Sequence, residues 1–221
     1  MFNSDCWYNK VCDSYSDNCI DSCIRYKEMR YLVDNSNIPE NRQVPQSLSA
    51  PNCDYEAFCR LAEIKDDITE FVAEGKNLYI TSESTGNGKT SWAIKLILKY
   101  FDMMWAGNGF KERGLFIHVP TFLLKCKDFS TKDSDFERIK ELLPNVDLVI
   151  WDDIASTELS AYDYSQMLMY LDVRISNNKS NIFTGNITSR DNLQKALAGK
   201  LTSRIWSNNT EIITFKGGDR R

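Results

Sequence analysis

The segment from 77 to 91 constrains the fold of this chain more than any other part of its sequence. It reads NLYIT and then SESTGNGKTS, so a short apolar run leads into a loop with two glycines and then into Lys-Thr. A buried strand, such a loop and the first turn of a helix form the arrangement in which successive backbone N–H groups face a phosphate. We therefore expect ATP to bind here through Gly86, Asn87, Gly88, Lys89, Thr90 and Ser91, with the Thr90 hydroxyl as a ligand of Mg²⁺.

One position of this loop departs from the full pattern G-x-x-x-x-G-K-[ST]. Its first glycine is replaced by Glu83. A carboxylate facing the phosphates would repel them, so we expect the Glu83 side chain to point away from them. A surface turn with a chance GKT is the alternative, but the strand before the loop and the apolar helix after it argue against this alternative.

A second informative segment, VDLVIWDD at 146–153, is a buried-strand pattern that ends in two carboxylates. Ligands of parallel sheets bind at the carboxyl ends of the strands. We therefore expect Asp152 to hold Mg²⁺, directly or through water, and Asp153 to orient and deprotonate an attacking water. A solvated acidic turn is the alternative for this segment taken alone. Paired acids favour hydrolysis over phosphate transfer to a small acceptor, which a small-molecule kinase would perform.

Two polar residues further along the chain are candidates for the same site. Asn186 ends the strand-like run NIFTGN, and Arg204 lies in KLTSRIW, on or after a predicted helix. Asn186 would lie beside the γ-phosphate and help to position the water. The Arg204 guanidinium could stabilise transition-state charge on the nucleotide of a neighbouring subunit, as an arginine finger. A strand-end turn residue and a surface salt bridge are the ordinary alternatives.

Hydrophobic periodicity predicts an alternation of strands and helices from residue 54 onward. Strands are expected at 77–81, 115–119, 147–151, 181–184 and 211–215, and helices at 23–33, 54–74, 89–105, 120–129, 134–143, 160–176 and 191–206. Such an alternation indicates a parallel sheet covered by helices on both faces. The strand at 115–119 separates the two motifs along the chain, which suits P-loop ATPases in which another strand lies between the two motif-bearing strands.

The N-terminal part differs in composition from the rest. Cys6, Cys12, Cys19 and Cys23 lie within eighteen residues, with five, six and three residues between them. Four thiolates could fold such a core-poor segment around a tetrahedral Zn²⁺, and unliganded reduced thiols are the alternative. Cys53 and Cys59 are possible substitutes as ligands, whereas Cys126 falls in a predicted helix and is expected in the core. We expect a Cys-rich module at 1–35, a proline-containing linker at 36–52 and an ATPase domain at 53–221.

Charge and hydropathy exclude some classes of protein. The net charge is −4 and the pI is near 5.2, so a global basic field is absent and contact with nucleic acid requires a local patch or a ring of subunits. An export signal and a membrane-spanning stretch are missing from the pattern, so we expect a cytoplasmic protein. His118, the single histidine, falls in a strand pattern and is expected to be packed.

These motifs, in this order, resemble the DnaC/DnaI-type helicase loaders and the related IstB-like transposition ATPases, which belong to the AAA+ class. The resemblance covers roughly residues 36–221, is loose, and is greatest to phage-encoded replication members. Its motifs are NIPENRQVPQSL, STGNGKT, LFIHVPTFL, DLVIWDDIAS, NIFTGN, KLTSRIW and FKGGDRR. It implies a three-layer α/β/α AAA+ domain with a parallel sheet and a minimal or absent C-terminal lid. A small N-terminal module is part of the same expectation.

The resemblance also implies roles. Gly86 to Thr90 match the family's Walker A loop, and Asp152 and Asp153 match its Walker B acids. Asn186 matches its sensor asparagine and Arg204 its arginine finger. The implied function is ATP-dependent loading of a hexameric replicative helicase onto single-stranded DNA, with ATP-dependent self-association and with the N-terminal zinc module gripping the helicase. The alternatives are a transposition helper ATPase and a nucleotide-gated adaptor that scarcely hydrolyses ATP. A phage-encoded protein of this kind would act in the cytoplasm of a bacterial host.

Overall fold

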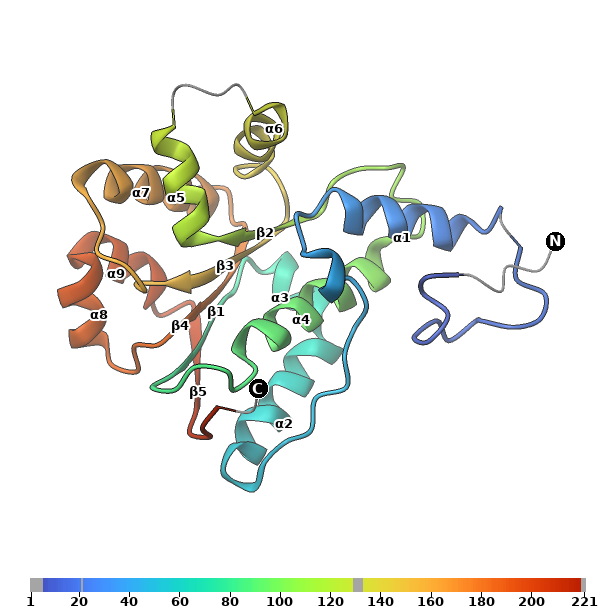
Figure 1. Ribbon diagram of the computed structural model, residues 1–221, viewed down its shortest axis with the longest axis horizontal. Coiled ribbons are helices and arrows are strands. Elements are labelled where there is room, and N and C mark those ends of the chain that lie inside the picture. The colour runs from blue at the N-terminus through green and yellow to red at the C-terminus, as the bar shows by residue number, and fades with distance from the viewer. Residues whose placement is uncertain (1–5, 21, 129–132, 220–221) are drawn as a thin grey trace.

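A five-stranded parallel sheet forms the centre of the molecule (Figure 1). The computed structural model describes residues 6–20, 22–128 and 133–219. Along the sheet the strands follow the order β2-β3-β4-β1-β5, and each neighbouring pair is parallel. Their bounds are β1 Asn77–Ser82, β2 Gly114–His118, β3 Leu148–Ile154, β4 Ser180–Gly185 and β5 Thr210–Phe215. The two motif-bearing strands, β1 and β3, are therefore separated by β4, and the 115–119 strand lies outside them as β2.

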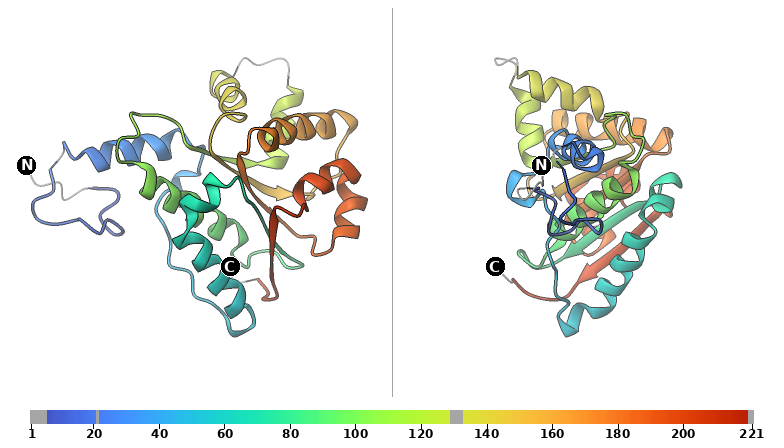
Figure 2. Two further views of the ribbon diagram at one scale, coloured as in Figure 1. Left: turned by 180° about the vertical axis from the view of Figure 1, so that it is seen from behind. Right: turned by 90° about the vertical axis from the view of Figure 1, so that its right-hand side faces the viewer.

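Helices cover both faces of this sheet (Figures 1 and 2). Side chains alternate along each strand, so that Leu78 and Ile80 enter one apolar cluster while Tyr79 enters the other. The first cluster is closed by α1 Ile24–Asp34, α2 Tyr55–Asp66, α3 Ile68–Ala73 and α4 Lys89–Met104. The second is closed by α5 Val119–Lys127, α6 Ser134–Leu142, α7 Ala161–Ser176, α8 Arg190–Leu197 and α9 Gly199–Ile205. The expected three-layer α/β/α architecture is confirmed.

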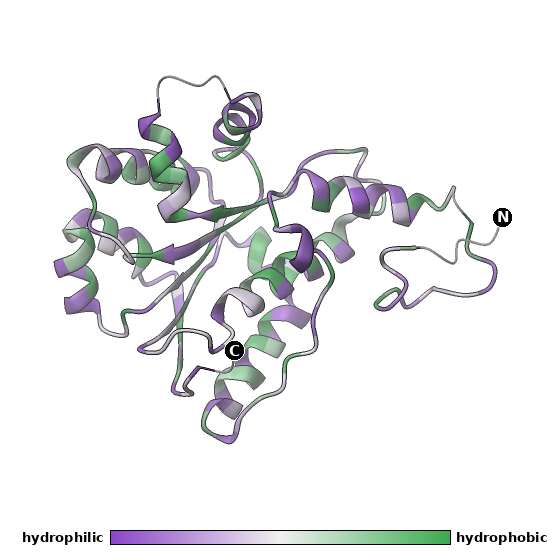
Figure 3. Cartoon of the chain, in the orientation of Figure 1, coloured by the Kyte–Doolittle hydropathy of each residue, from purple (hydrophilic) through white to green (hydrophobic). Residues whose placement is uncertain are grey.

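Hydrophilic and hydrophobic residues alternate along the helices, as expected where each helix buries one side (Figure 3).

Two predicted helices are each divided in the structure. The helix predicted at 54–74 is interrupted at Asp67, and that predicted at 191–206 at Ala198, whose φ of 62° lies in the left-handed region. The next helix, α9, begins with a hydrogen bond in which the Ala198 carbonyl accepts from the Thr202 N–H at 3.1 Å. A left-handed helix end is usually a glycine, so the sequence offered no signal at this alanine.

The N-terminal segment packs against the same core as the sheet. Tyr8, Met29 and Leu32 belong to the apolar cluster that contains β1, and α1 contacts α4. The backbone at Ser36 accepts from the Phe116 N–H at 2.7 Å, which attaches the segment to the outer edge of β2. The boundaries of module and linker stay predictions.

The chain is described as far as residue 219, and between β5 and that point it contains no helix. The minimal or absent C-terminal lid stays a prediction. No helix in the described part of the chain combines the length and apolar character needed to cross a lipid bilayer.

A buried arginine connects α7 to the amino-terminal ends of the central strands. Arg174 has no exposed surface. Its guanidinium donates to the Asn181 side chain at 2.7 Å and to three backbone carbonyls at 2.6 to 2.9 Å, those of Leu143, Val146 and Ser180. A planar donor group with five N–H bonds suits acceptors that lie in several directions. Arg174 therefore ties α7 to the segment before β3 and to the start of β4.

Arg174→Met should lower the free energy of unfolding by more than about 3 kcal/mol, because several buried acceptors lose their donor at about 1–3 kcal/mol each. Arg174→Lys should also destabilise the folded protein, since one ammonium cannot reach all the acceptors that the planar guanidinium contacts. Arg30→Ala is the matched control: its i,i+4 pair with Asp34 is exposed, so its removal should change stability by about 0.5 kcal/mol at most. Urea unfolding measures all three. An Arg174→Met protein as stable as Arg30→Ala would contradict the assignment.

Candidate active site

The phosphate loop connects the carboxyl end of β1 to the first turn of α4. Gly86 and Gly88 have φ angles of 68° and 101°, in the region that side-chain-bearing residues avoid. Gly88 stands at the N-cap of α4 and has no side chain to cap the helix, so the N–H groups of the first turn can face an anion. The local sequence thus forms the bend that phosphate binding requires.

Lys89 lies folded into this loop. Its Nζ donates to Ser82 Oγ at 2.7 Å, to the Ser84 carbonyl at 2.8 Å and to Asn87 Oδ1 at 3.2 Å. The side chain is largely buried, and a buried ammonium requires such acceptors. The loop therefore keeps the cation beside the helix start, where the β- and γ-phosphates would lie.

One hydrogen bond joins the phosphate-loop motif to the acidic motif. Thr90 Oγ1 donates to Asp152 Oδ1 at 2.7 Å, although 62 residues separate them along the chain. Asp152 is buried at the carboxyl end of β3. A hydroxyl and a carboxylate side by side are the oxygen ligands that Mg²⁺ prefers. The residues present therefore fit a magnesium site held by Thr90 and Asp152.

Asp153 occupies an unusual backbone position. Its φ is 63°, its N–H donates to Thr184 Oγ1 at 3.0 Å, and its carboxylate is partly exposed. Asp153 Oδ2 lies 4.0 Å from His118 Nε2, while His118 Nδ1 lies 2.8 Å from Thr121 Oγ1 of α5. The expectation that His118 is packed is wrong, because β2 ends at this residue and leaves its ring exposed beside the acid.

Sequence reasoning missed His118 and Thr184 as members of this site. The signal for His118 was available in part, since it follows a strand and precedes a helix, as the acids do. The β2–β3 register, which places His118 opposite Asp152, is what brings it to the acidic pair. Thr184 lies inside the run NIFTGN, in which the sequence pattern indicates only the final Asn186 as a site residue.

Asn186 follows β4 at the same edge of the sheet. Its Oδ1 is buried and, within the described residues, has no hydrogen-bond partner. Buried acceptors are rarely left unpaired unless a water or ligand meets them. This geometry is compatible with the predicted role of Asn186 in holding a water.

Glu83, at the position of the missing glycine, is exposed, and its Oε1 accepts from Thr188 Oγ1 at 3.4 Å. The carboxylate thus lies against the loop that follows β4. On the other side of the loop, Asn87 Nδ2 donates to the Gly217 carbonyl at 3.2 Å. The adjoining Gly218-Asp219-Arg220 resembles the terminal box of the helicase loaders, but Arg220 lies outside the described residues.

Arg204 lies on α9 and is paired with α7. Its Nε donates to Asp172 Oδ1 at 2.5 Å, and about two fifths of the side chain is exposed (41%). The structure gives it no hydrogen bond to Lys89, Thr90 or the acids among the described residues. A role in its own nucleotide site is therefore without structural support, and a role toward a neighbouring subunit stays a prediction.

The four N-terminal cysteines border one small cavity. Cys6, Cys12, Cys19 and Cys23 all line a space of about 30 Å³. Among residues 6–20, 22–128 and 133–219, however, no three His, Cys, Asp or Glu side chains lie close enough together to hold a metal ion. The zinc site stays a prediction.

Cys126 is buried, as expected, and burial raises the pKa of its thiol to about 11.

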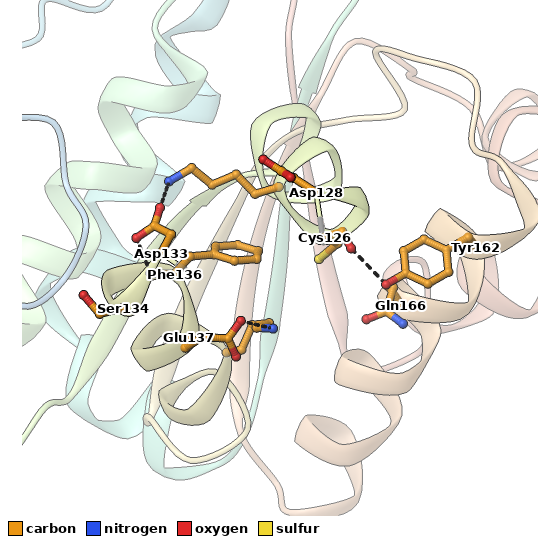
Figure 4. A pocket seen from close by; sticks show the side chains of 10 residues that line it. Cys126, Asp128, Asp133, Ser134, Phe136, Glu137, Tyr162 and Gln166 are labelled. Carbon is orange, nitrogen blue, oxygen red and sulfur yellow. Dashed lines mark hydrogen bonds and ion pairs between the residues drawn. The ribbon is translucent and has the colours of Figure 1, made fainter. Parts of the chain in front are cut away.

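A larger cavity of about 630 Å³ lies between α5, α6 and α7, away from the phosphate loop (Figure 4). Four of its charged side chains form two ion pairs. Lys125 contacts Asp133 at 2.8 Å and Lys140 contacts Glu137 at 2.6 Å, and the Tyr162 hydroxyl donates to the Cys126 carbonyl. These pairs leave the cavity without an evident ligand class.

Lys89→Ala should weaken ATP binding by about 10–100-fold, since a hydrogen bond to a charged group contributes about 1.5–3 kcal/mol. Lys99→Ala, on the same helix but paired only loosely with Asp102 at 3.9 Å, is the control and should bind ATP as wild type does. Titration of a fluorescent ATP analogue measures both. Wild-type affinity in Lys89→Ala would contradict the phosphate-loop assignment.

No protein-family model and no curated protein sequence matches the chain. Solved structures do match. The helicase loader DnaC aligns at 18% identity with a TM-score of 0.60 over 86% of this chain and 99% of the loader. DnaI aligns at 19% identity with a TM-score of 0.63 over 82% and 96%. The AMPPCP-bound DnaA of Aquifex aeolicus aligns at 14% identity with a TM-score of 0.57 over 75% and 48%. The chain therefore shares the fold of the DnaC and DnaI helicase loaders.

Proposed function

We propose that this protein is an ATPase that loads a hexameric replicative helicase onto single-stranded DNA. The observation that carries the ATPase part is the hydrogen bond between Thr90 and Asp152, which joins the phosphate loop to the acidic pair at the carboxyl edge of the sheet. The loading part is supported by the alignment, which covers nearly all of the solved DnaC and DnaI chains. The AMPPCP-bound DnaA shows that a protein of related fold binds an ATP analogue.

Each residue of the site has a task in hydrolysis. The N–H groups of 86–91 and the Lys89 ammonium bind the phosphates. Thr90 and Asp152 would hold Mg²⁺, which would neutralise part of the negative charge of the phosphates. Asp153 takes a proton from the attacking water as its oxygen bonds to the γ-phosphorus and the bond to the bridging oxygen of ADP breaks. Asn186 holds that water through its unpaired Oδ1. Inorganic phosphate and ADP then leave.

The Cys-rich segment is the proposed contact with the helicase. A zinc ion bound by Cys6, Cys12, Cys19 and Cys23 would hold together the loops of this segment, whose Tyr8 packs into the apolar cluster that α1 and α4 share. ATP-bound subunits would associate around single-stranded DNA. This arrangement compensates for the negative net charge, because several subunits can bring local cations together on one strand.

Pull-down from cells with ATP present should recover a hexameric replicative helicase, and the purified protein should contain about one zinc per chain. Replacing Cys19 and Cys23 with Ser should release the metal and abolish helicase recovery while ATP binding persists. The same replacements at Cys53 and Cys59, which are exposed, provide the control. Recovery of a transposase instead of a helicase would reject the loading role in favour of transposition, and metal-free wild type would reject the zinc module.

Arg204→Ala should bind ATP normally but hydrolyse it on the order of 10³-fold more slowly, because a trans arginine finger contributes at least that factor. Mixing it with Lys89→Ala protein should restore part of the turnover, because the Lys89→Ala subunit retains its arginine. The ATP concentration is kept too low to fill the weakened site of that variant. Wild-type specific activity should rise with protein concentration.

Asp172→Ala separates this role from that of a surface ion pair. It removes the partner of Arg204 but leaves the guanidinium, and exposed pairs contribute only about 0–1 kcal/mol. Turnover should then equal or exceed that of wild type. Equal losses in Asp172→Ala and Arg204→Ala, with no rescue in the mixture, would reject the trans finger. Normal ATP binding with negligible turnover in wild type would instead indicate a nucleotide-gated adaptor.

A further inference from the structure

Opposite the acidic pair, the ladder between β3 and β4 loses its regular register. Trp151 pairs with Phe183 and Ile154 pairs with Gly185. Two residues of β3, Asp152 and Asp153, therefore stand opposite a single residue of β4, Thr184. This two-to-one count is that of a β-bulge, a feature that bends a strand and redirects side chains beside active sites.

The bulge explains how two adjacent acids can serve one site. In a regular strand successive side chains point to opposite faces of the sheet. Here Asp152 contacts Thr90 on the α4 side, while Asp153 adopts a φ of 63°, in the left-handed region that such residues seldom occupy. Its carboxylate comes to lie 4.0 Å from His118 at the end of β2. A backbone held in this region must be fixed by its surroundings.

The Thr184 hydroxyl provides two of the contacts that fix it. It donates to Asp152 Oδ1 at 2.7 Å and accepts from the Asp153 N–H at 3.0 Å. The residue is buried, with 2% of its surface exposed, so water does not substitute freely for either bond. A hydroxyl can donate and accept at once. One side chain therefore holds the carboxylate of the first acid and the backbone of the second.

The neighbouring Gly185 shows that the bulge is part of the packing. A Cβ at this position would lie 2.7 Å from Tyr79 Oη and 3.1 Å from Ile154 Cγ1. The first distance is shorter than real Cβ contacts, and the second is tighter than most of them. A side chain at this position would therefore press on Tyr79 of β1 and on the bulged strand.

We propose that Thr184 is a positioning residue of the ATPase site, which sets the Asp152 carboxylate for Mg²⁺ and the Asp153 backbone for water activation. This inference rests on the proposed function. Thr184 acts through the two acids that it contacts. Groups that orient metal ligands in this way typically contribute about 10–100-fold to metal affinity or activity.

Thr184→Val, which keeps the shape and removes the hydroxyl, is the test, and Thr184→Ser, which keeps the hydroxyl, is its rescue. In Thr184→Val, the rate of single-turnover hydrolysis should fall by about 10–100-fold. Adding Mg²⁺ should raise the ATP affinity of this variant less than it raises that of wild type. In EDTA the ATP affinity of the variant should equal that of wild type. Without nucleotide or metal, the Asp153 amide should exchange faster with solvent by NMR. Thr184→Ser should retain most of the wild-type values in all three measurements.

Thr81→Val is the matched control. This buried threonine on β1 donates to the Ile187 carbonyl at 2.8 Å, and Tyr79 Oη donates to the same oxygen at 2.9 Å, so the carbonyl keeps a partner in the variant. Its Mg²⁺ dependence and Asp153 exchange should be those of wild type. Thermal unfolding of each variant shows whether it is folded.

Equal losses in Thr184→Val and Thr81→Val would mean a general packing effect and overturn the inference, as would wild-type Mg²⁺ dependence and exchange in Thr184→Val. If wild type binds ATP but does not hydrolyse it, the hydrolysis part of the proposed function is wrong, and Mg²⁺ dependence and exchange alone decide on Thr184. If wild type binds no ATP, the proposed function and this inference are both wrong.

Discussion

The carboxylate of Asp152 connects the parts of this molecule on which the site depends. Its Oδ1 accepts from Thr90 at the start of α4 and from Thr184 on β4, both at 2.7 Å. Because β4 lies between β1 and β3, these two bonds span the sheet from the phosphate-loop strand to the acidic strand. All the strands are parallel, so their carboxyl ends and the loops that leave them share one edge. Local motifs that are far apart in sequence become a single site only through this topology.

Sequence reasoning succeeded where the determining pattern is local. The bend at Gly86 and Gly88, the apolar strands and the buried α4 follow from residues that are neighbours along the chain. It failed where pairing between strands decides. The exposure of His118 and the two-to-one register opposite Thr184 depend on the β2–β3 and β3–β4 ladders, which no window of sequence contains. Ala198 represents a third kind of failure, since a left-handed alanine carries no glycine signal.

The segment after β5, at the C-terminal end of the described chain, attaches to the part of the molecule that carries the site. Asp54, at the start of α2, is buried and accepts from the Lys216 and Gly217 N–H groups at 2.6 to 3.2 Å. The Gly217 carbonyl in turn accepts from Asn87, whose Oδ1 accepts from Lys89. Hydrogen bonds therefore lead from the segment after β5 to the phosphate-loop lysine. A change in the position of Lys89 on binding phosphate would reach that segment through one side chain.

The charge of the site supports the proposal that a residue from outside the subunit completes it. The described residues that meet there include two carboxylates, those of Asp152 and Asp153, and one lysine, Lys89. Bound ATP would add further negative charge, and the transition state of hydrolysis spreads charge over the equatorial γ-oxygens. Mg²⁺ held by Thr90 and Asp152 would balance part of this charge. Arg204 is tied to Asp172 by an exposed pair that costs little to open, so a guanidinium from a neighbouring subunit can supply the missing cation without rearrangement of the core.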